Sequence, residues 1–190
     1  MRETNTQDAL LAAAMELFSE KGYAAVTTKE IAAKAGVSEV TLFRYFETKS
    51  KLYHQVFEKY IFYPNLEIFF EQNISWDLSK DLLNLALMIQ EMVFNNFKLL
   101  KMSLKNDPDF HHNEDLKKFP NAIKAKLASY FAAMKERGKI TGEPEILAII
   151  FLLANSGLYM NFYHNIYKTE FQHEECLRSL VDIFTQGIKR

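Results

Sequence analysis

Cysteine, glycine and proline are scarce in this sequence. Its 190 residues include one Cys, six Gly and four Pro. The single Cys176 excludes an intrachain disulfide and a zinc site built from several cysteines, and it fits a reducing compartment such as the cytoplasm. Few helix-breaking residues, together with long stretches rich in Leu, Ala, Lys, Glu and Met, favour an all-α fold.

A long hydrophobic run is also missing. The longest apolar stretch, residues 146–154, is nine residues long, whereas a membrane-spanning helix needs about 20. This stretch therefore predicts a helix buried between protein surfaces. The N-terminus lacks the charged-then-apolar pattern of a secretory signal. We expect a cytoplasmic protein with no membrane partner.

An excess of positive charge is absent as well. The formal net charge is −1, and residues 1–52 carry seven Lys/Arg and seven Asp/Glu. Any attraction to nucleic acid phosphates must therefore come from the placement of a few cations. We expect Lys29, Arg44, Lys49 and Lys51 to lie on one side, with most acids elsewhere.

Helical periodicity runs through most of the chain and predicts about nine helices. A first helix begins at a Thr4/Gln7 capping box and ends at Gly22. Later helices are predicted at about 50–61, before a kink or stop at Pro64, and as one long helix at 79–105. Three more are predicted: one over 120–137, one opened by Glu143-Pro144-Glu145 and running to about Tyr167, and one from Thr169 to the C-terminus.

Residues 27–51 are the most informative segment. Thr27 with Glu30 forms a capping box, Gly36 supplies a turn, Ser38 caps a helix over 39–46, and Thr48 caps the next one. Two short helices joined by a tight turn form a helix-turn-helix, a unit that places its second helix in the DNA major groove.

This segment and the helix before it closely resemble the DNA-binding domain of the TetR family of bacterial transcriptional regulators. The resemblance covers about the first quarter of the chain and is carried by Ala14, Leu17, Phe18, Gly22, Tyr23, Thr27, Thr28, Ile31, Ala32, Ala35, Gly36, Val37, Ser38, Thr41, Leu42, Phe43, Tyr45, Phe46, Lys49 and Leu52. It implies a helix-turn-helix domain over 1–50, followed by a helical ligand-binding and dimerisation domain over 51–190.

The resemblance also implies which residues contact double-stranded DNA. They are Thr27, Thr28, Lys29, Ser38, Glu39, Val40, Thr41, Phe43, Arg44, Tyr45 and Lys49. Glu39 would accept from a cytosine amino group, and Val40 or Thr41 would touch a thymine methyl. The family more often has Tyr at position 43, so Phe43 lacks a hydroxyl for phosphate, and Tyr45 replaces a frequent His.

The last two helices are implied to form a four-helix interface with a second subunit. The predicted interface residues are Ile149, Ile150, Leu153, Gly157, Met160, Leu180, Ile183, Phe184 and Gly187. Such an isologous homodimer has two-fold symmetry, which requires a near-palindromic operator.

A cavity for a small apolar or aromatic effector is implied within the helical domain. Its candidate lining residues are Tyr60, Tyr63, Phe69, Met88, Met92, Phe94, Phe110, Phe131, Asn155 and Tyr159. For any one aromatic or methionine among them, a place in the ordinary core is the favoured interpretation. Asn155 and Asn161 need polar partners, because an unpaired buried amide is costly.

The sequence thus predicts an effector-responsive transcriptional regulator, most simply a repressor, with no cofactor. The alternative is a helical protein-interaction module in which the helix-turn-helix is only a fold element, an alternative that the neutral N-terminal charge favours. An enzyme is disfavoured because no catalytic motif is recognisable. A metal site at His111 and His112 is also disfavoured, because adjacent side chains point in different directions.

Overall fold

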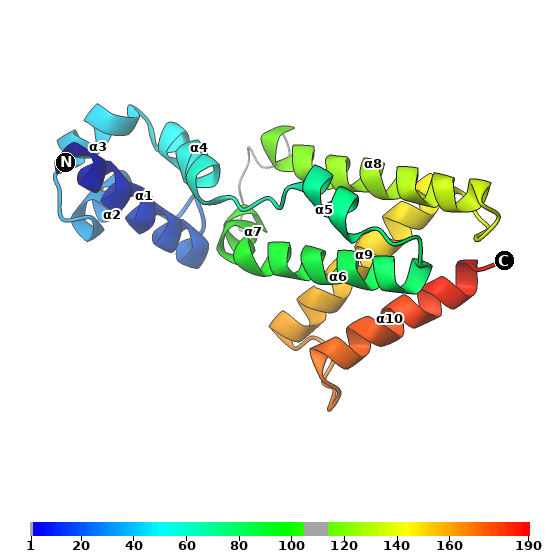
Figure 1. Ribbon diagram of the computed structural model, residues 1–190. Helices are drawn as coiled ribbons and strands as arrows, with labels where there is room; N and C mark the ends of the chain where they lie inside the picture. The colour runs from blue at the N-terminus through cyan, green and yellow to red at the C-terminus, as the bar shows by residue number, and fades with distance from the viewer. Residues whose placement is uncertain (1, 105–113) are drawn as a thin grey trace. The chain divides into compact units, whose positions relative to one another are not determined.

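A computed structural model describes residues 2–104 and 114–190, and within these residues the chain forms ten helices (Figure 1). The all-α prediction is confirmed. The chain divides into two compact units. One comprises residues 1–62 and 95–113, and the other comprises 63–94 and 114–190. The predicted boundary after residue 50 falls inside a helix of the first unit.

The first unit contains α1 (Arg2–Lys21), α2 (Thr28–Lys34), α3 (Glu39–Phe46), α4 (Lys49–Tyr60) and α7 (Phe97–Leu104). Helix α1 packs against α2, α4 and α7. Its apolar side chains recur at helical spacing, and Leu10, Ala14 and Phe18 are fully buried. Leu99 and Met102 of α7 are buried too. The helix-turn-helix therefore rests on a small core of its own.

Local side-chain bonds fix the bounds of the three helices that follow α1. The Thr27 hydroxyl accepts from the backbone N–H of Glu30 at 3.2 Å, and the Glu30 carboxylate accepts from the N–H of Thr27 at 2.9 Å. The Ser38 and Thr48 hydroxyls cap α3 and α4 by accepting from the N–H groups of Thr41 and Lys51, without the reciprocal bond. Gly36 has a φ of 71°, a conformation that costs glycine little, so the chain turns there between α2 and α3.

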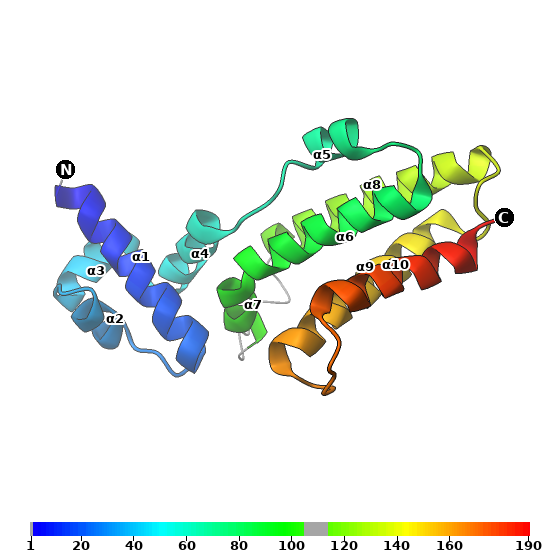
Figure 2. The same cartoon turned by 60° about the horizontal axis from the view of Figure 1, so that its bottom comes forward.

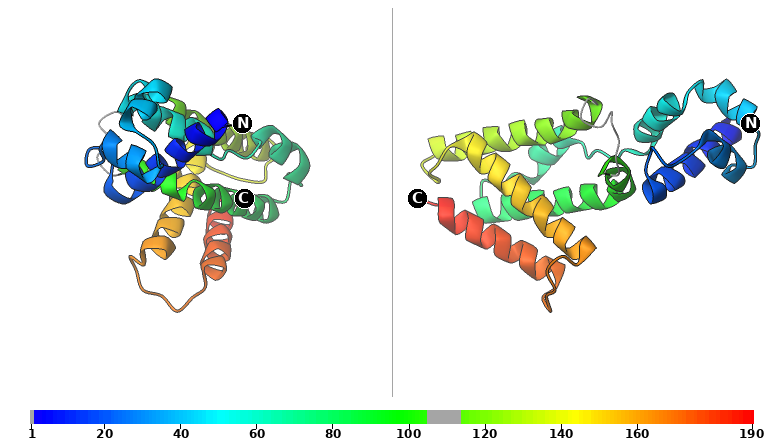
Figure 3. Two further views of the ribbon diagram at one scale, coloured as in Figure 1. Left: turned by 90° about the vertical axis from the view of Figure 1, so that its left-hand side faces the viewer. Right: turned by 180° about the vertical axis from the view of Figure 1, so that it is seen from behind.

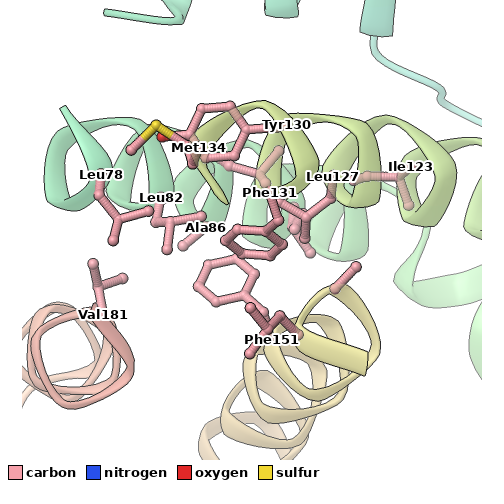
Figure 4. Packing of buried hydrophobic residues seen from close by; sticks show 14 of the residues in the cluster. Leu78, Leu82, Ala86, Ile123, Leu127, Tyr130, Phe131, Met134, Phe151 and Val181 are labelled. Atoms are coloured by element: carbon pink, nitrogen blue, oxygen red, sulfur yellow. The ribbon is translucent and has the colours of Figure 1, made fainter. Parts of the chain in front are cut away.

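The second unit contains α5 (Leu66–Asn73), α6 (Leu78–Asn95) as far as Phe94, α8 (Glu114–Glu136), α9 (Pro144–His164) and α10 (His173–Ile188). Helix α9 packs against α8 and α10, and Figures 2 and 3 show α9 and α10 side by side. Figure 4 shows the core, in which Phe131 of α8 and Phe151 of α9 point toward each other among leucines of α6 and α8.

A buried carboxylate organises the connection between α5 and α6. Asp81 accepts from the Ser75 backbone N–H at 2.8 Å, the Ser75 hydroxyl at 2.7 Å and the Tyr130 hydroxyl at 2.9 Å. Burial and this bond to Asp81 raise the pKa of Tyr130. Beside it, Trp76 has a φ of 63° and stacks on Tyr130. The Arg137 guanidinium carbon lies 3.2 Å from the centre of the Trp76 ring.

Several predicted helix boundaries were wrong. The first helix begins at Arg2, before its predicted cap Thr4, and α9 ends at His164 rather than near Tyr167. The long helix predicted at 79–105 is divided by a break at Asn96 into α6 and α7. The helix predicted at 120–137 begins earlier, at Glu114, so Pro120 lies inside it. The last helix begins at His173 rather than near Thr169, because Gln172 and Glu175 form the capping box. Phe110, His111 and His112 lie outside the described residues.

Candidate nucleic-acid interface

Helix α3 turns one face to the core and the opposite face to solvent. Leu42 and Phe46 are buried. Val40, Phe43 and Arg44 lie three and four residues apart, so they share one face. Val40 is 79% exposed and Phe43 is 42% exposed. Two large apolar side chains beside a cation on one solvent-facing helix surface form a patch that suits thymine methyl groups and phosphates.

Four of the predicted DNA-contacting hydroxyls already have partners within the protein. The Thr28 hydroxyl donates to the Glu39 carboxylate at 2.5 Å, and this bond joins α2 to the first turn of α3. The Thr27 hydroxyl donates to Glu30 at 2.9 Å. The Thr41 hydroxyl lies 2.9 Å from that of Ser38. The Thr27 and Thr28 hydroxyls therefore stabilise the helix-turn-helix from within. Glu39 keeps one carboxylate oxygen for other contacts.

Ion pairs divide the cations of residues 21–51 into two groups. Lys21, Lys34 and Lys51 pair with Glu30, Glu16 and Glu47 at 2.8, 2.7 and 2.6 Å. Within the described residues, Lys29, Arg44 and Lys49 form no ion pair. The acids of the neutral segment 1–52 are thus partly neutralised by lysines other than those three. Lys51, expected on the DNA-facing side, is held by Glu47.

Lys49 and Arg44 are instead held by aromatic rings. The Lys49 ammonium lies 4.3 Å from the centre of the Tyr23 ring, and the Arg44 guanidinium carbon lies 5.3 Å from that of Tyr45. Partial burial lowers the pKa of Lys49. A cation over a ring keeps its charge available while its side chain is restrained, so both are suited to contact phosphates.

The predicted interface residues of α9 and α10 are largely exposed in the single chain. Leu153 is 68% and Ile183 is 72% exposed, and Ile149 and Ile150 are exposed as well. A Cβ added at Gly157 or Gly187 would meet nothing within 4 Å. Met160 and Leu180 are half-buried. Phe184 turns inward, with its ring centre 5.2 Å from that of Phe151. By length and composition, Pro144–Tyr163 is also apolar enough to cross a membrane.

The structure does not gather the predicted effector residues around one described cleft. Tyr60 belongs to the first unit. In the second unit, Phe131 is fully buried in the core, Phe94 is exposed, Met88 and Tyr159 are buried, and Phe69 and Met92 pack on the core's edge. Tyr63 stacks on Phe119 with ring centres 4.6 Å apart. An open cleft of about 570 Å³ between α5 and α8 is lined by other residues, among them Pro64, Phe119 and Lys126.

A buried pair of amides joins α6 to α9, and only one of its members was predicted. The Gln90 amide nitrogen donates to the backbone carbonyl of Asn155 at 3.0 Å and also contacts its side-chain oxygen. The Asn155 amide donates to the Ala86 carbonyl at 3.4 Å. The Gln90 side-chain oxygen is buried without a hydrogen-bond partner. A lone Gln within the apolar periodicity of α6 was the available signal.

Together, the helix-turn-helix and the patch on α3 define a helix-turn-helix transcriptional regulator, and the comparisons agree. Residues 10–56 match the family described as "Bacterial regulatory proteins, tetR family". The uncharacterized HTH-type transcriptional regulator YvkB of Bacillus subtilis (strain 168) is 32% identical over 99% of this chain and 98% of its own length. The chain belongs to the TetR family.

Two further relatives differ in how they act. The HTH-type transcriptional activator FasR of Mycolicibacterium smegmatis is 42% identical over 52 residues, which are 27% of this chain and 24% of that relative. The crystal structure of NalD, the secondary repressor of the MexAB-OprM multidrug efflux pump in Pseudomonas aeruginosa, has a TM-score of 0.76. Its sequence is 21% identical, and the match covers 100% of this chain and 98% of the NalD chain. The two proteins therefore share a fold.

Proposed function

We propose that this protein is a homodimeric, effector-responsive repressor that binds a near-palindromic operator in the bacterial cytoplasm. The solvent-facing patch of Val40, Phe43 and Arg44 on α3 is the observation that carries the proposal. In a soluble domain, exposed apolar side chains at a helix-turn-helix surface are best explained by a partner that covers them. Major-groove base edges with thymine methyl groups are such a partner.

The DNA contacts divide by chemistry. Lys29, Arg44 and Lys49 bind phosphates, or a guanine in the case of Arg44, because within the described residues none of the three forms an ion pair. Val40 and Phe43 make apolar base contacts. Thr27 and Thr28 act mainly by holding α2 and α3 together, since their hydroxyl protons are already donated to Glu30 and Glu39.

The homodimer forms through α9 and α10. Their outer faces present apolar side chains that no described residue of the chain covers, and two glycines allow the backbones to approach closely. A second copy offers the same faces, so burial is reciprocal. This arrangement places the membrane-length apolar stretch of α9 in a protein interface.

The effector is small and largely apolar or aromatic, and it binds in the second unit. The concentration of Phe, Tyr and Met there supports this proposal, and the Gln90–Asn155 pair supplies a polar group next to the core. A lone unpaired acceptor favours a ligand with a hydrogen-bond donor. Effector binding releases the operator only if it favours one dimer geometry over another.

The decisive experiment is footprinting of the DNA upstream of the protein's own gene and its neighbours at several salt concentrations. A protected, near-palindromic site whose affinity falls steeply with salt supports the proposal. A gene deletion followed by transcript measurement then separates a repressor, whose targets rise, from an activator. If no duplex is bound at low salt even after genome-wide selection, the proposal fails and a protein-interaction role takes its place.

A further inference from the structure

The chain leaves the first unit after Phe62 and re-enters it at Asn95. Helix α4 ends at Tyr60, and its capping residue Ile61 donates its N–H to the Phe57 carbonyl at 2.9 Å. The next residue, Phe62, has no helical partner for its own N–H and C=O. Both groups must be satisfied from elsewhere in the chain.

Asn96 satisfies both of them. This residue occupies the one-residue break between α6 and α7 and is only 7% exposed. Its side-chain oxygen accepts from the Phe62 N–H at 2.7 Å, and its side-chain N–H₂ donates to the Phe62 carbonyl at 2.6 Å. A primary amide carries one acceptor and one donor group in the spacing that this reciprocal pairing needs. We call these two bonds the Asn96 clip.

The clip lies where two connections meet. Helix α4 is anchored to α1 by the Lys59–Asp8 ion pair, the Gln7–Gln55 bond and the ring contact between Tyr53 and Phe18. On the other side of the clip, α7 is anchored to α1 through buried Leu99 and Met102. The chain passes between the two units at residues 62–63 and 94–95. At both places, the first-unit side of the connection is held by a helix that packs on α1. The clip ties these two connections directly to each other.

We propose that Asn96 is a positioning residue that locks these two connections together and thereby sets the spacing of the two α3 helices on DNA. This proposal rests on the proposed function, because spacing matters only in a dimer that reads two half-sites. A dimer whose reading units are held at fixed spacing binds both half-sites with little further ordering. Loosening the connections leaves each α3 intact but weakens simultaneous binding.

The test uses the full-length protein and three variants. Asn96→Ala removes both bonds. Asn96→Asp keeps the side-chain volume but faces the Phe62 carbonyl with a second oxygen in place of the donor. Asn95→Ala is the matched control, since Asn95 is the adjacent, exposed asparagine. Sedimentation velocity first confirms that every variant remains folded and dimeric.

Binding is measured by fluorescence anisotropy with three duplexes. One is the operator selected with the wild-type protein, one has a single half-site scrambled, and one has a base pair inserted between the half-sites. For Asn96→Ala and Asn96→Asp we expect operator affinity to fall about tenfold while half-site affinity is unchanged. The penalty for the inserted base pair should shrink. Asn95→Ala should match the wild type on all three.

Two results would overturn the proposal. Wild-type affinity and wild-type spacing preference in Asn96→Ala would show that the clip does not set the spacing. An equal loss on operator and half-site would show that Asn96 supports only the fold of the helix-turn-helix.

If the wild-type protein binds no duplex, the proposed function has failed. Hydrogen exchange then still reports on the clip, because the Phe62 amide should be protected in the wild type and exchange faster in Asn96→Ala.

Discussion

Truncation of Leu153 to alanine tests the dimer interface quantitatively. Full burial of a leucine side chain stabilises by about 2 kcal/mol. Leu153 is 68% exposed in the single chain, so roughly 1.4 kcal/mol remains to be gained on association. Two-fold symmetry doubles this to roughly 2.8 kcal/mol per dimer. The dissociation constant of the Leu153→Ala dimer should therefore be about 100-fold larger than that of the wild type.

Sedimentation equilibrium over a range of protein concentrations measures this change directly. Leu153→Asp should weaken the dimer further, because a carboxylate would be buried without a partner. Ile68→Ala on α5 is the control, since Ile68 is exposed but lies outside the proposed interface. Both Leu153 variants should have the thermal stability of the wild-type monomer once the contribution of dimerisation is subtracted. A dimer constant within about threefold of wild type in both Leu153 variants, or an equal effect of Ile68→Ala, would refute this assignment of the interface.

Three other predictions concern DNA binding and stability. Arg44→Ala and Thr41→Ala should weaken operator binding in gel-shift titrations and leave dimerisation intact. If Arg44 contacts phosphate, the salt slope should also fall by about one; operator affinities equal to wild type in both variants would place the reading surface elsewhere. Asp81→Ala should lower the free energy of unfolding by about 3 kcal/mol or more in urea titrations, because the buried Tyr130 hydroxyl loses its acceptor; a loss below about 1 kcal/mol would mean that water replaces the carboxylate. The bonds from Lys21 and Thr27 lower the pKa of Glu30 from 4.5 to about 2. Its contribution to stability is therefore complete above pH 4.5 and is lost as pH falls through about 2, and Glu30→Gln should flatten the pH dependence of unfolding across that window.

Local chemistry explains why the helix-turn-helix could be predicted closely. Its helix ends are set by Thr27, Ser38 and Thr48, each of which caps the helix that immediately follows it. Every bond involved joins residues three apart, so the sequence pattern contains the whole cause. The start of α2 and the bounds of α3 and α4 consequently agree with the predicted ones to within a residue.

The break at Asn96 has a long-range cause and could not be predicted. No Gly or Pro marks it, and the apolar pattern continues across it. The partner that favours the break is the backbone of Phe62, 34 residues away in sequence. Aromatic side chains raise the same problem for the effector site. Phe131 is fully buried and Phe94 is 71% exposed, yet periodicity and composition treat them alike.

Trp76 is the only tryptophan in the chain, and its setting makes it an intrinsic fluorescent reporter. The indole is stacked on Tyr130 and covered by the Arg137 guanidinium, and its backbone carbonyl accepts from Lys139 at 3.1 Å. Emission excited at the indole band therefore comes from one place, the junction of α5, α6 and α8. Quenching or a spectral shift on adding a compound would register a rearrangement of the second unit without any label. The first unit and bound DNA contribute no tryptophan signal, so effector binding could be titrated in the presence of operator DNA without interference from it.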